Sequence, residues 1–213
     1  MYANSKGLKY LHGVEVYLTA ALEPKQRDNY HTILIAKNFE GVKEINTLVD
    51  LSTQSDHMYY KPRITFDEFF NISDNVIKIS ACLASPLSKY PNFIGKLVDE
   101  KIVELEKNKE TEANKLYAEL NSEAAKEAWI EDFAAIYNTS YEIYVEQCIE
   151  KSNNAFDLQI EEAKSELENA KIVYDKLMKT YDYYEIQPHV KSMDQIRYNK
   201  MLYEASRKYN KPL

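Results

Sequence analysis

The sequence predicts an α/β protein that carries a long antiparallel helical insertion. Short apolar runs of strand length alternate with helical patterns in residues 1–91 and again in residues 181–213, which is typical of βαβ units. Residues 92–180 instead contain one Gly, no Pro and a helical hydrophobic period. Only four glycines occur in the whole chain, which favours long helices over an all-β fold.

Residues 1–91 are the first predicted domain. Three runs in it have strand length and are rich in β-branched and aromatic residues: Tyr10–Leu18, Thr32–Ala36 and Val76–Ala81. Because helical patterns separate such runs, we expect parallel pairing in a βαβ arrangement.

Two helix starts can be read in the same domain. Asn38 is a residue type that caps helix N-termini, and it precedes an apolar face with helical spacing, made of Val42, Ile45, Leu48 and Val49. Thr65 and Glu68 have the spacing of a capping box, ahead of a short helix. The capping box explains Glu68 and its neighbour Asp67 without a catalytic role.

Residues 92–180 are the second predicted domain, a helical insertion. Apolar residues recur there at alternating steps of four and three, as in the seam of a coiled coil. They are Phe156, Ile160, Ala163, Leu167, Ala170, Tyr174, Leu177 and Tyr181. Asn153 and Asn154 interrupt the preceding pattern, so we place a corner between two antiparallel helices there. The last helix should then be about 35–40 Å long.

Residues 181–213 return to the α/β pattern. Tyr183–Gln187 is expected to form a strand, and Ser192 with Gln195 can cap a helix that runs to about Tyr209. Lys211–Leu213 is expected to lead into a further strand. The sequence therefore predicts a sheet that is cut at this point, with one edge left unpaired.

Composition excludes several classes of protein. The net charge of −7 and the pI near 5.3 argue against a surface that binds nucleic acid by charge alone, so we expect only indirect contact with DNA. Cys82 and Cys148 are far apart, which predicts neither a disulfide framework nor a zinc ribbon. No apolar run approaches the length of a membrane span. We expect a cytoplasmic protein with no membrane partner.

Six segments, in order along the chain, resemble the PHP (polymerase and histidinol phosphatase) domain of the bacterial and phage DNA polymerase III α subunit family. The family reads GIKP–IIGCEVY, HLVLLAKNEEGY, YYKPRI, ISACLAGE, EIQDHG and IPLVATND at these places. The matching segments here are Gly7–Lys9 with Gly13–Tyr17, Tyr30–Asn38 with Glu40–Gly41, Tyr59–Ile64, Ile79–Ala84, Tyr184–Gln187 with His189, and Lys211–Leu213. The resemblance covers about half of the chain and implies a partial PHP-type distorted β/α barrel.

The resemblance also implies a metal site. Carried over residue by residue, Glu15, His31 and Cys82 match metal ligands of the family, and a carboxylate, an imidazole and a thiolate suit zinc or manganese. The family's opening HxH, its following Asp, its DHG motif and its closing DxH motif are missing. Without the resemblance, Glu15 is most simply a surface carboxylate, His31 a hydrogen-bonded histidine and Cys82 a small buried side chain.

Three functions follow as hypotheses. The first is a fragment of a replicative DNA polymerase III α subunit. Its PHP domain would act either as a scaffold or as a remnant phosphoesterase or proofreading module. Its partner would be the rest of the polymerase, encoded by the same gene or by the other part of a split gene. The second is a stand-alone PHP phosphoesterase. The third is a protein-interaction module that works through the helical arm.

The sequence leaves open whether the chain is itself an enzyme. By resemblance the family is one of DNA-directed DNA polymerases, but the chain contains neither a polymerase active site nor most of the PHP metal ligands. Lys61 and Arg63 are candidates for phosphate contact, although two cations are also ordinary on a surface.

Overall fold

The computed structural model describes residues 2–23, 26–132, 140–188 and 192–213. The chain divides into two compact units. The first, here called the α/β unit, combines residues 1–92 with residues 171–213, and the second, the helical unit, consists of residues 93–170. The α/β unit is therefore built from two segments that are distant in sequence.

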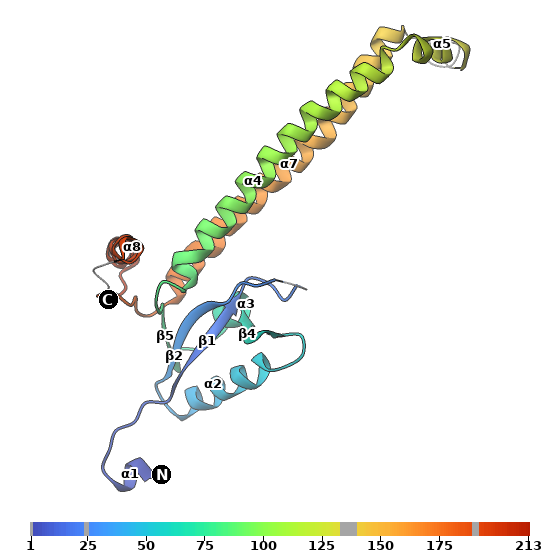
Figure 1. Ribbon diagram of the computed structural model, residues 1–213. Coiled ribbons are helices and arrows are strands. Elements are labelled where there is room, and N and C mark those ends of the chain that lie inside the picture. The colour runs from blue at the N-terminus through green and yellow to red at the C-terminus, as the bar shows by residue number, and fades with distance from the viewer. Residues whose placement is uncertain (1, 24–25, 133–139, 189–191) are drawn as a thin grey trace. The chain divides into compact units, whose positions relative to one another are not determined.

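A five-stranded sheet forms the centre of the α/β unit, in the order β3-β4-β1-β2-β5 (Figure 1). The strands are β1 (Gly13–Thr19), β2 (Tyr30–Ala36), β3 (Met58–Tyr59), β4 (Lys61–Thr65) and β5 (Val76–Ile79).

The expectation of parallel pairing is correct for β1 with β4 and wrong for the other pairs. β1 with β2, β2 with β5, and β3 with β4 are all antiparallel. The described residues between β1 and β2 contain no helix, so the chain turns back beside the strand it has just left.

Both predicted helix caps of the first domain are confirmed. Asn38 caps α2 (Phe39–Ser52) by accepting a hydrogen bond from the Gly41 amide. Thr65 and Glu68 form both halves of a capping box at the start of α3 (Phe66–Phe70). A further short helix, α1 (Tyr2–Ser5), precedes the sheet.

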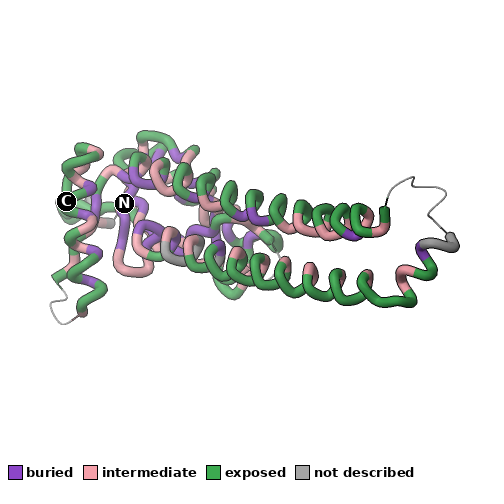
Figure 2. Tube along the Cα trace, turned by 90° about the horizontal axis from the view of Figure 1, so that it is seen from above, coloured by how far each residue is buried: buried purple, intermediate pink, exposed green. Residues whose placement is uncertain are grey.

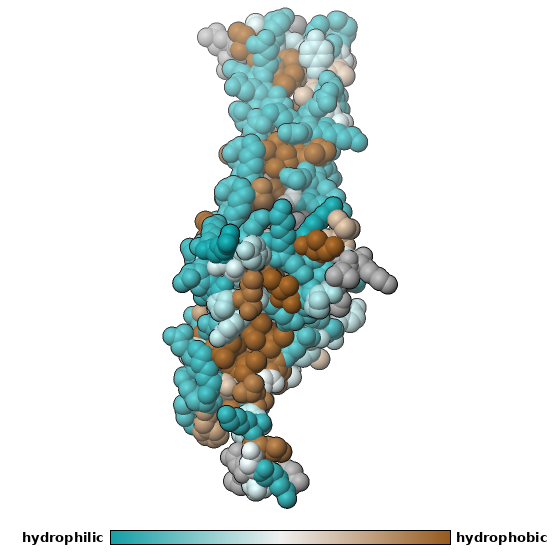
Figure 3. All heavy atoms as spheres, turned by 90° about the vertical axis from the view of Figure 1, so that its left-hand side faces the viewer, coloured by the Kyte–Doolittle hydropathy of each residue, from teal (hydrophilic) through white to brown (hydrophobic). Residues whose placement is uncertain are grey.

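The two faces of the sheet differ in burial, because successive side chains of a strand point to opposite sides. One face is buried and faces α2; it contains Val16, Leu18, Thr32, Leu34 and Val76. On β1, β2 and β5 the other face is half-exposed to exposed; it contains Glu15, Tyr17, His31, Ile33, Ile35, Ile77 and Ile79. We call this second set the open face. Figure 3 shows a continuous hydrophobic area on this unit.

The second segment of the α/β unit adds to the edge of the sheet beyond β5. Asp182 donates a backbone hydrogen bond to Lys78, and Ser80 donates one to Tyr183. The strand expected at Tyr183–Gln187 is reduced to this one bridge, in which Tyr183 pairs in parallel with Ile79. The Tyr184 amide donates to the Pro212 carbonyl, at 3.0 Å, instead of to β5.

Tyr181 anchors this segment. Its side chain is fully buried, its ring lies 5.1 Å from the Phe69 ring, and its hydroxyl is hydrogen-bonded to Thr32 on the buried face of β2. The predicted cap at Ser192 is confirmed, because Ser192 accepts a hydrogen bond from the Gln195 amide at the start of α8 (Met193–Tyr209).

The helices of the second predicted domain are α4 (Pro86–Leu120), α5 (Glu123–Asp132) and α7 (Tyr141–Thr180). Within the helical unit α4 and α7 run antiparallel (Figure 1), and ion pairs join Lys101 to Glu166 and Lys109 to Asp157. Most other positions along this pair of helices are exposed (Figure 2). All eight residues of the predicted apolar repeat are buried or half-buried.

The corner predicted at Asn153 and Asn154 is wrong, because both residues lie inside the continuous helix α7. Asn is only a moderately poor helix former, costing well under 1 kcal/mol relative to Ala, and neither Gly nor Pro accompanies the pair. None of the described helices is long and apolar enough to cross a membrane.

Replacing Tyr181 by Phe should destabilise the α/β unit, because the Thr32 hydroxyl loses its buried partner. We expect a loss of about 1–3 kcal/mol in the free energy of unfolding, measured by urea titration. Tyr183→Phe is the matched control at a 42% exposed position and should change the same quantity by less than about 0.5 kcal/mol. Equal effects of the two substitutions would contradict the anchoring role of Tyr181.

Candidate functional site

The three residues carried over as metal ligands lie close together in the α/β unit. Glu15 on β1 and His31 on β2 both belong to the open face, and their strands are adjacent. Glu15 Oε1 lies 3.4 Å from His31 Nδ1. Cys82 follows β5, and its Sγ lies 3.9 Å from the same nitrogen. His31 is therefore the centre of the group.

A tight turn after β5 places Cys82. Ala81 has a left-handed backbone, with φ of 56°, which is unusual for a residue that carries a Cβ. The His31 amide donates to the Ala84 carbonyl at 2.9 Å, so the turn is fastened to the start of β2. The thiol itself accepts a hydrogen bond from the Ala84 amide, at 3.4 Å.

The surroundings of His31 are aromatic and basic on one side. The edge of its ring meets the Tyr17 ring at a centroid distance of 5.1 Å. The Lys61 ammonium lies 4.1 Å from the centroid of the same tyrosine ring. The side chains of Glu15 and His31 are 48% and 26% exposed, so the group is open to solvent and to ligands.

The three donors do not form a metal site as they are placed here. Among the described residues, no group of three or more His, Cys, Asp and Glu side chains is arranged to hold one metal ion. Both Glu15 and Cys82 approach Nδ1 of His31, so they compete for one imidazole nitrogen. His189, which belongs to a matched family segment but is not a predicted ligand, lies outside the described residues.

Sequence reasoning missed a buried phenol on α8, that of Tyr198. Burial raises the pKa of Tyr198, on α8, to about 12, although the nearby hydroxyls of Ser85 and Ser80 favour its ionised form. The phenol oxygen is buried and completes no hydrogen bond with the described residues. No sequence signal identified it, because α8 meets the turn after β5 only through the tertiary fold.

Arg63 is not the surface cation that the sequence suggested, because its side chain is 1% exposed. Its guanidinium donates to the Gln26 carbonyl at 2.9 Å and to the His57 carbonyl at 3.4 Å. The Asp28 carboxylate lies 3.9 Å away. Arg63 thus joins the segment after β1 to the segment before β3 and is unavailable for a phosphate.

His57 is held between two carboxylates. Its Nδ1 lies 2.8 Å from Asp56 and its Nε2 lies 2.8 Å from Glu68, the capping-box residue of α3. Burial of the ring opposes protonation, but the hydrogen bonds to Asp56 and Glu68 outweigh it and raise the pKa of His57. The hydrogen bond to His57 in turn lowers the pKa of Asp56. This cluster stabilises the start of α3.

Comparison with known proteins gives the family. A model described as the PHP domain matches residues 1–131. The chain belongs to the PHP domain family.

Three curated relatives are each a DNA polymerase III subunit alpha. The protein from Borreliella burgdorferi is 37% identical over 87 residues, which cover 38% of this chain and 8% of the relative. That from Aquifex aeolicus is 24% identical over 195 residues, covering 86% of this chain and 14% of the relative. The protein from Chlamydia pneumoniae is 32% identical over 89 residues, which cover 39% of this chain and 7% of the relative.

The chain thus spans between 7% and 14% of the length of these relatives. Both the PHP match and the Aquifex aeolicus alignment extend into residues 92–180. Part of the predicted insertion therefore has a counterpart in the family.

The His57 cluster should make stability depend on pH. Because the folded-state pKa of His57 is raised, its contribution is complete below its unfolded value of about 6.5 and is lost as the pH rises through the folded value. We expect urea unfolding to give a lower free energy at about pH 8.5 than at about pH 6, and His57→Gln to shrink that difference. An unchanged difference in the variant would show that other groups cause it.

Proposed function

We propose that the chain is the PHP module of a replicative polymerase of the DNA polymerase III α kind, and that it acts there as a scaffold. The observation that carries this proposal is the open face of the sheet. Four isoleucines, two on β2 and two on β5, form cross-strand pairs on it: Ile33 with Ile79 and Ile35 with Ile77. All four are only half-buried within the chain.

The proposed partner is the remainder of the polymerase, in the same polypeptide or in a separate one. Polypeptide covering the four isoleucines would remove apolar surface from water, at about 25 cal/mol per Å². The relatives, of which this chain spans at most 14%, have the additional polypeptide to do so. In this proposal the sheet is part of a distorted β/α barrel.

Glu15, His31 and Cys82 are, in the same proposal, the remnant of a metal site that once held zinc or manganese. Their placement around one nitrogen of His31 supports a remnant over a working centre. When bound, such a metal would supply Lewis acidity for phosphoester hydrolysis. The stand-alone phosphoesterase stays the alternative to a scaffold.

The division into residues 1–91, 92–180 and 181–213 also stays a proposal, with the central block as a coiled-coil-like arm. Its ion pairs and its apolar repeat are consistent with two helices that pack on each other. A partner that binds this arm is the third candidate.

The metal content of the purified chain distinguishes the scaffold role from the phosphoesterase role. We expect the purified chain, dialysed without chelator, to contain substoichiometric zinc and manganese by plasma mass spectrometry, because in the part of the chain that the structure describes no three donors are arranged to hold one metal ion. Cys82→Ser should leave the content unchanged, as should Cys148→Ser, the matched thiol control. One equivalent of metal that only Cys82→Ser abolishes would overturn the scaffold reading of this site.

Co-purification tests the partner. The polymerase polypeptide encoded in the source genome, tagged and co-expressed, should retain the chain. The double variant Ile35→Asp with Ile77→Asp should weaken retention more than tenfold, because each isoleucine buried in the complex contributes about 1.5–3 kcal/mol to binding. Ile172→Asp, at a 67% exposed position, is the control. Circular dichroism checks that each variant folds. Undiminished retention of the double variant would refute docking on the open face.

A further inference from the structure

Charge is unevenly distributed between the two units. The helical unit, residues 93–170, has eight Lys and Arg against nineteen Asp and Glu. The α/β unit has nineteen Lys and Arg against fifteen Asp and Glu. The acidity of the whole chain therefore comes from the helical unit, and the α/β unit is net basic. The whole-chain charge is no argument against a polyanion on the α/β unit.

Tyr60 is displayed at the tip of the hairpin between β3 and β4. Its side chain is 79% exposed, yet its backbone is left-handed, with φ of 58°. Such a backbone costs a bulky residue free energy of order 1–2 kcal/mol. The ring meets the Tyr59 ring at a centroid distance of 4.7 Å, but most of its surface stays exposed. A left-handed backbone that displays a mostly exposed ring points to a role for the ring outside the fold.

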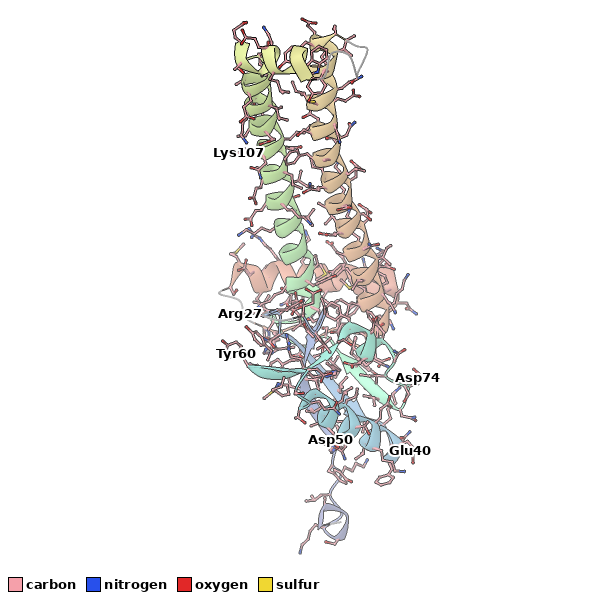
Figure 4. All side chains as sticks on the ribbon, turned by 90° about the vertical axis from the view of Figure 1, so that its right-hand side faces the viewer. Arg27, Glu40, Asp50, Tyr60, Asp74 and Lys107 are labelled. Atoms are coloured by element: carbon pink, nitrogen blue, oxygen red, sulfur yellow. The ribbon has the colours of Figure 1, made fainter. Side chains whose placement is uncertain are left out.

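A guanidinium accompanies the exposed ring. Arg27 Cζ lies 5.9 Å from the centroid of Tyr60. Figure 4 shows the two residues at the same edge of the α/β unit, on the side away from the labelled carboxylates Glu40 and Asp74. Arg27 is itself exposed.

Buried Arg63 fixes this pair. It bonds the carbonyl of Gln26, next to Arg27, and its guanidinium lies 5.4 Å from the centroid of Tyr59, next to Tyr60. The loop and the hairpin are therefore held together by one buried side chain, which preorganises the exposed pair above it.

Two carboxylates near the pair in sequence are already engaged, whereas Glu23, four residues before Arg27, is exposed. Asp28 accepts hydrogen bonds from the Thr19 hydroxyl and the Ala20 amide, and its side chain is 3% exposed. Asp56 is bound to His57. Neither carboxylate is free to neutralise Arg27.

A second cation–aromatic pair follows along the sheet. Lys61, the residue after Tyr60, lies over the ring of Tyr17, and Tyr17 meets His31 edge to face. A strip of basic and aromatic side chains thus leads from Lys61 through Tyr17 to the Glu15–His31–Cys82 group, and Tyr60 directly precedes Lys61 in the sequence. Proteins bind single-stranded nucleic acid with aromatic rings on which bases stack and with cations that pair with the phosphates.

We propose that Arg27, Tyr60, Lys61 and Tyr17 form a contact site for single-stranded nucleic acid. A base stacks on the exposed face of Tyr60, and Arg27 and Lys61 pair with the flanking phosphates. Unpaired strands are favoured over duplex because bases in a duplex already stack on one another. This inference goes beyond the scaffold role and rests only on residues of this chain.

Fluorescence anisotropy of a labelled oligothymidylate of about 12 nucleotides, with the full chain at about 50 mM salt, tests the site. We expect saturable binding that Tyr60→Ala weakens at least fivefold and that Tyr60→Phe preserves, because the ring carries the stacking. Arg27→Ala and Lys61→Ala should each lower the slope of log K against log salt by about one.

The matched control is Tyr203→Ala. Tyr203 on α8 is 48% exposed and has Arg207 5.1 Å from its ring centroid, so it is a cation–aromatic pair of the same kind outside the strip. We expect no change in affinity. Thermal unfolding of Tyr60→Ala should match or exceed the wild type, so that lost binding is not lost folding.

Two further probes identify the nucleic acid. Comparing the affinity for an oligouridylate of equal length with that for the oligothymidylate shows whether the site prefers RNA or DNA. Tight binding of either single strand supports the site. A duplex of equal length should bind at least tenfold more weakly than the single strand. Duplex binding as tight as single-strand binding, or an affinity that Tyr60→Ala leaves unchanged, overturns the proposal. Neither outcome bears on the co-purification test, which changes Ile35 and Ile77 on β2 and β5 and uses a protein partner.

Discussion

The pairing of residues 182–183 with the edge of β5 is the constraint on which the rest of the α/β unit depends. The Asp182 amide reaches the Lys78 carbonyl at 2.8 Å, and the Ser80 amide reaches the Tyr183 carbonyl at 3.1 Å. Tyr181, at the end of α7, enters the buried side of the sheet next to this pairing. Two segments about a hundred residues apart are thereby joined by backbone hydrogen bonds, which are independent of side-chain identity.

This pairing has a consequence for the candidate site. It holds the end of β5, so the turn that follows must leave the sheet at Ser80 and return toward β2, where Ala84 accepts the His31 amide. Cys82 reaches His31 for that reason. The β3–β4 hairpin lies at the opposite edge of the sheet from β5, so the isoleucines proposed for scaffold docking lie on β2 and β5, whereas the proposed nucleic-acid contact lies on the β3–β4 hairpin, on Tyr17 of β1 and on Arg27 before β2.

Local signals in the sequence predicted local structure well. The caps at Asn38, Thr65 and Ser192 were each correct, because a cap is set by residues within three positions of one another. The corner at Asn153 was wrong because a weak helix former does not break a helix that packs along its whole length. The direction of β2 was wrong because no sequence pattern states on which side a strand returns.

The site was predictable only as far as the family resemblance reached. Glu15, His31 and Cys82 lie close together, and their role as metal ligands stays a prediction, because the approach of two of them to one nitrogen is a matter of side-chain geometry. Arg63 was misread as surface because its partners are backbone carbonyls, which carry no sequence signal. Tyr198 was missed for a similar reason, since only the packing of α8 buries its hydroxyl.

Amide hydrogen exchange of the intact chain, resolved by residue with NMR, tests the joining of the two segments most directly. The amides of Ser80 and Asp182 should be protected to the same degree as those of the β1–β2 ladder, because all of them open only when the α/β unit unfolds. Exchange of Ser80 and Asp182 at the rate of an unstructured peptide, while the β1–β2 ladder stays protected, would contradict a unit built from both segments.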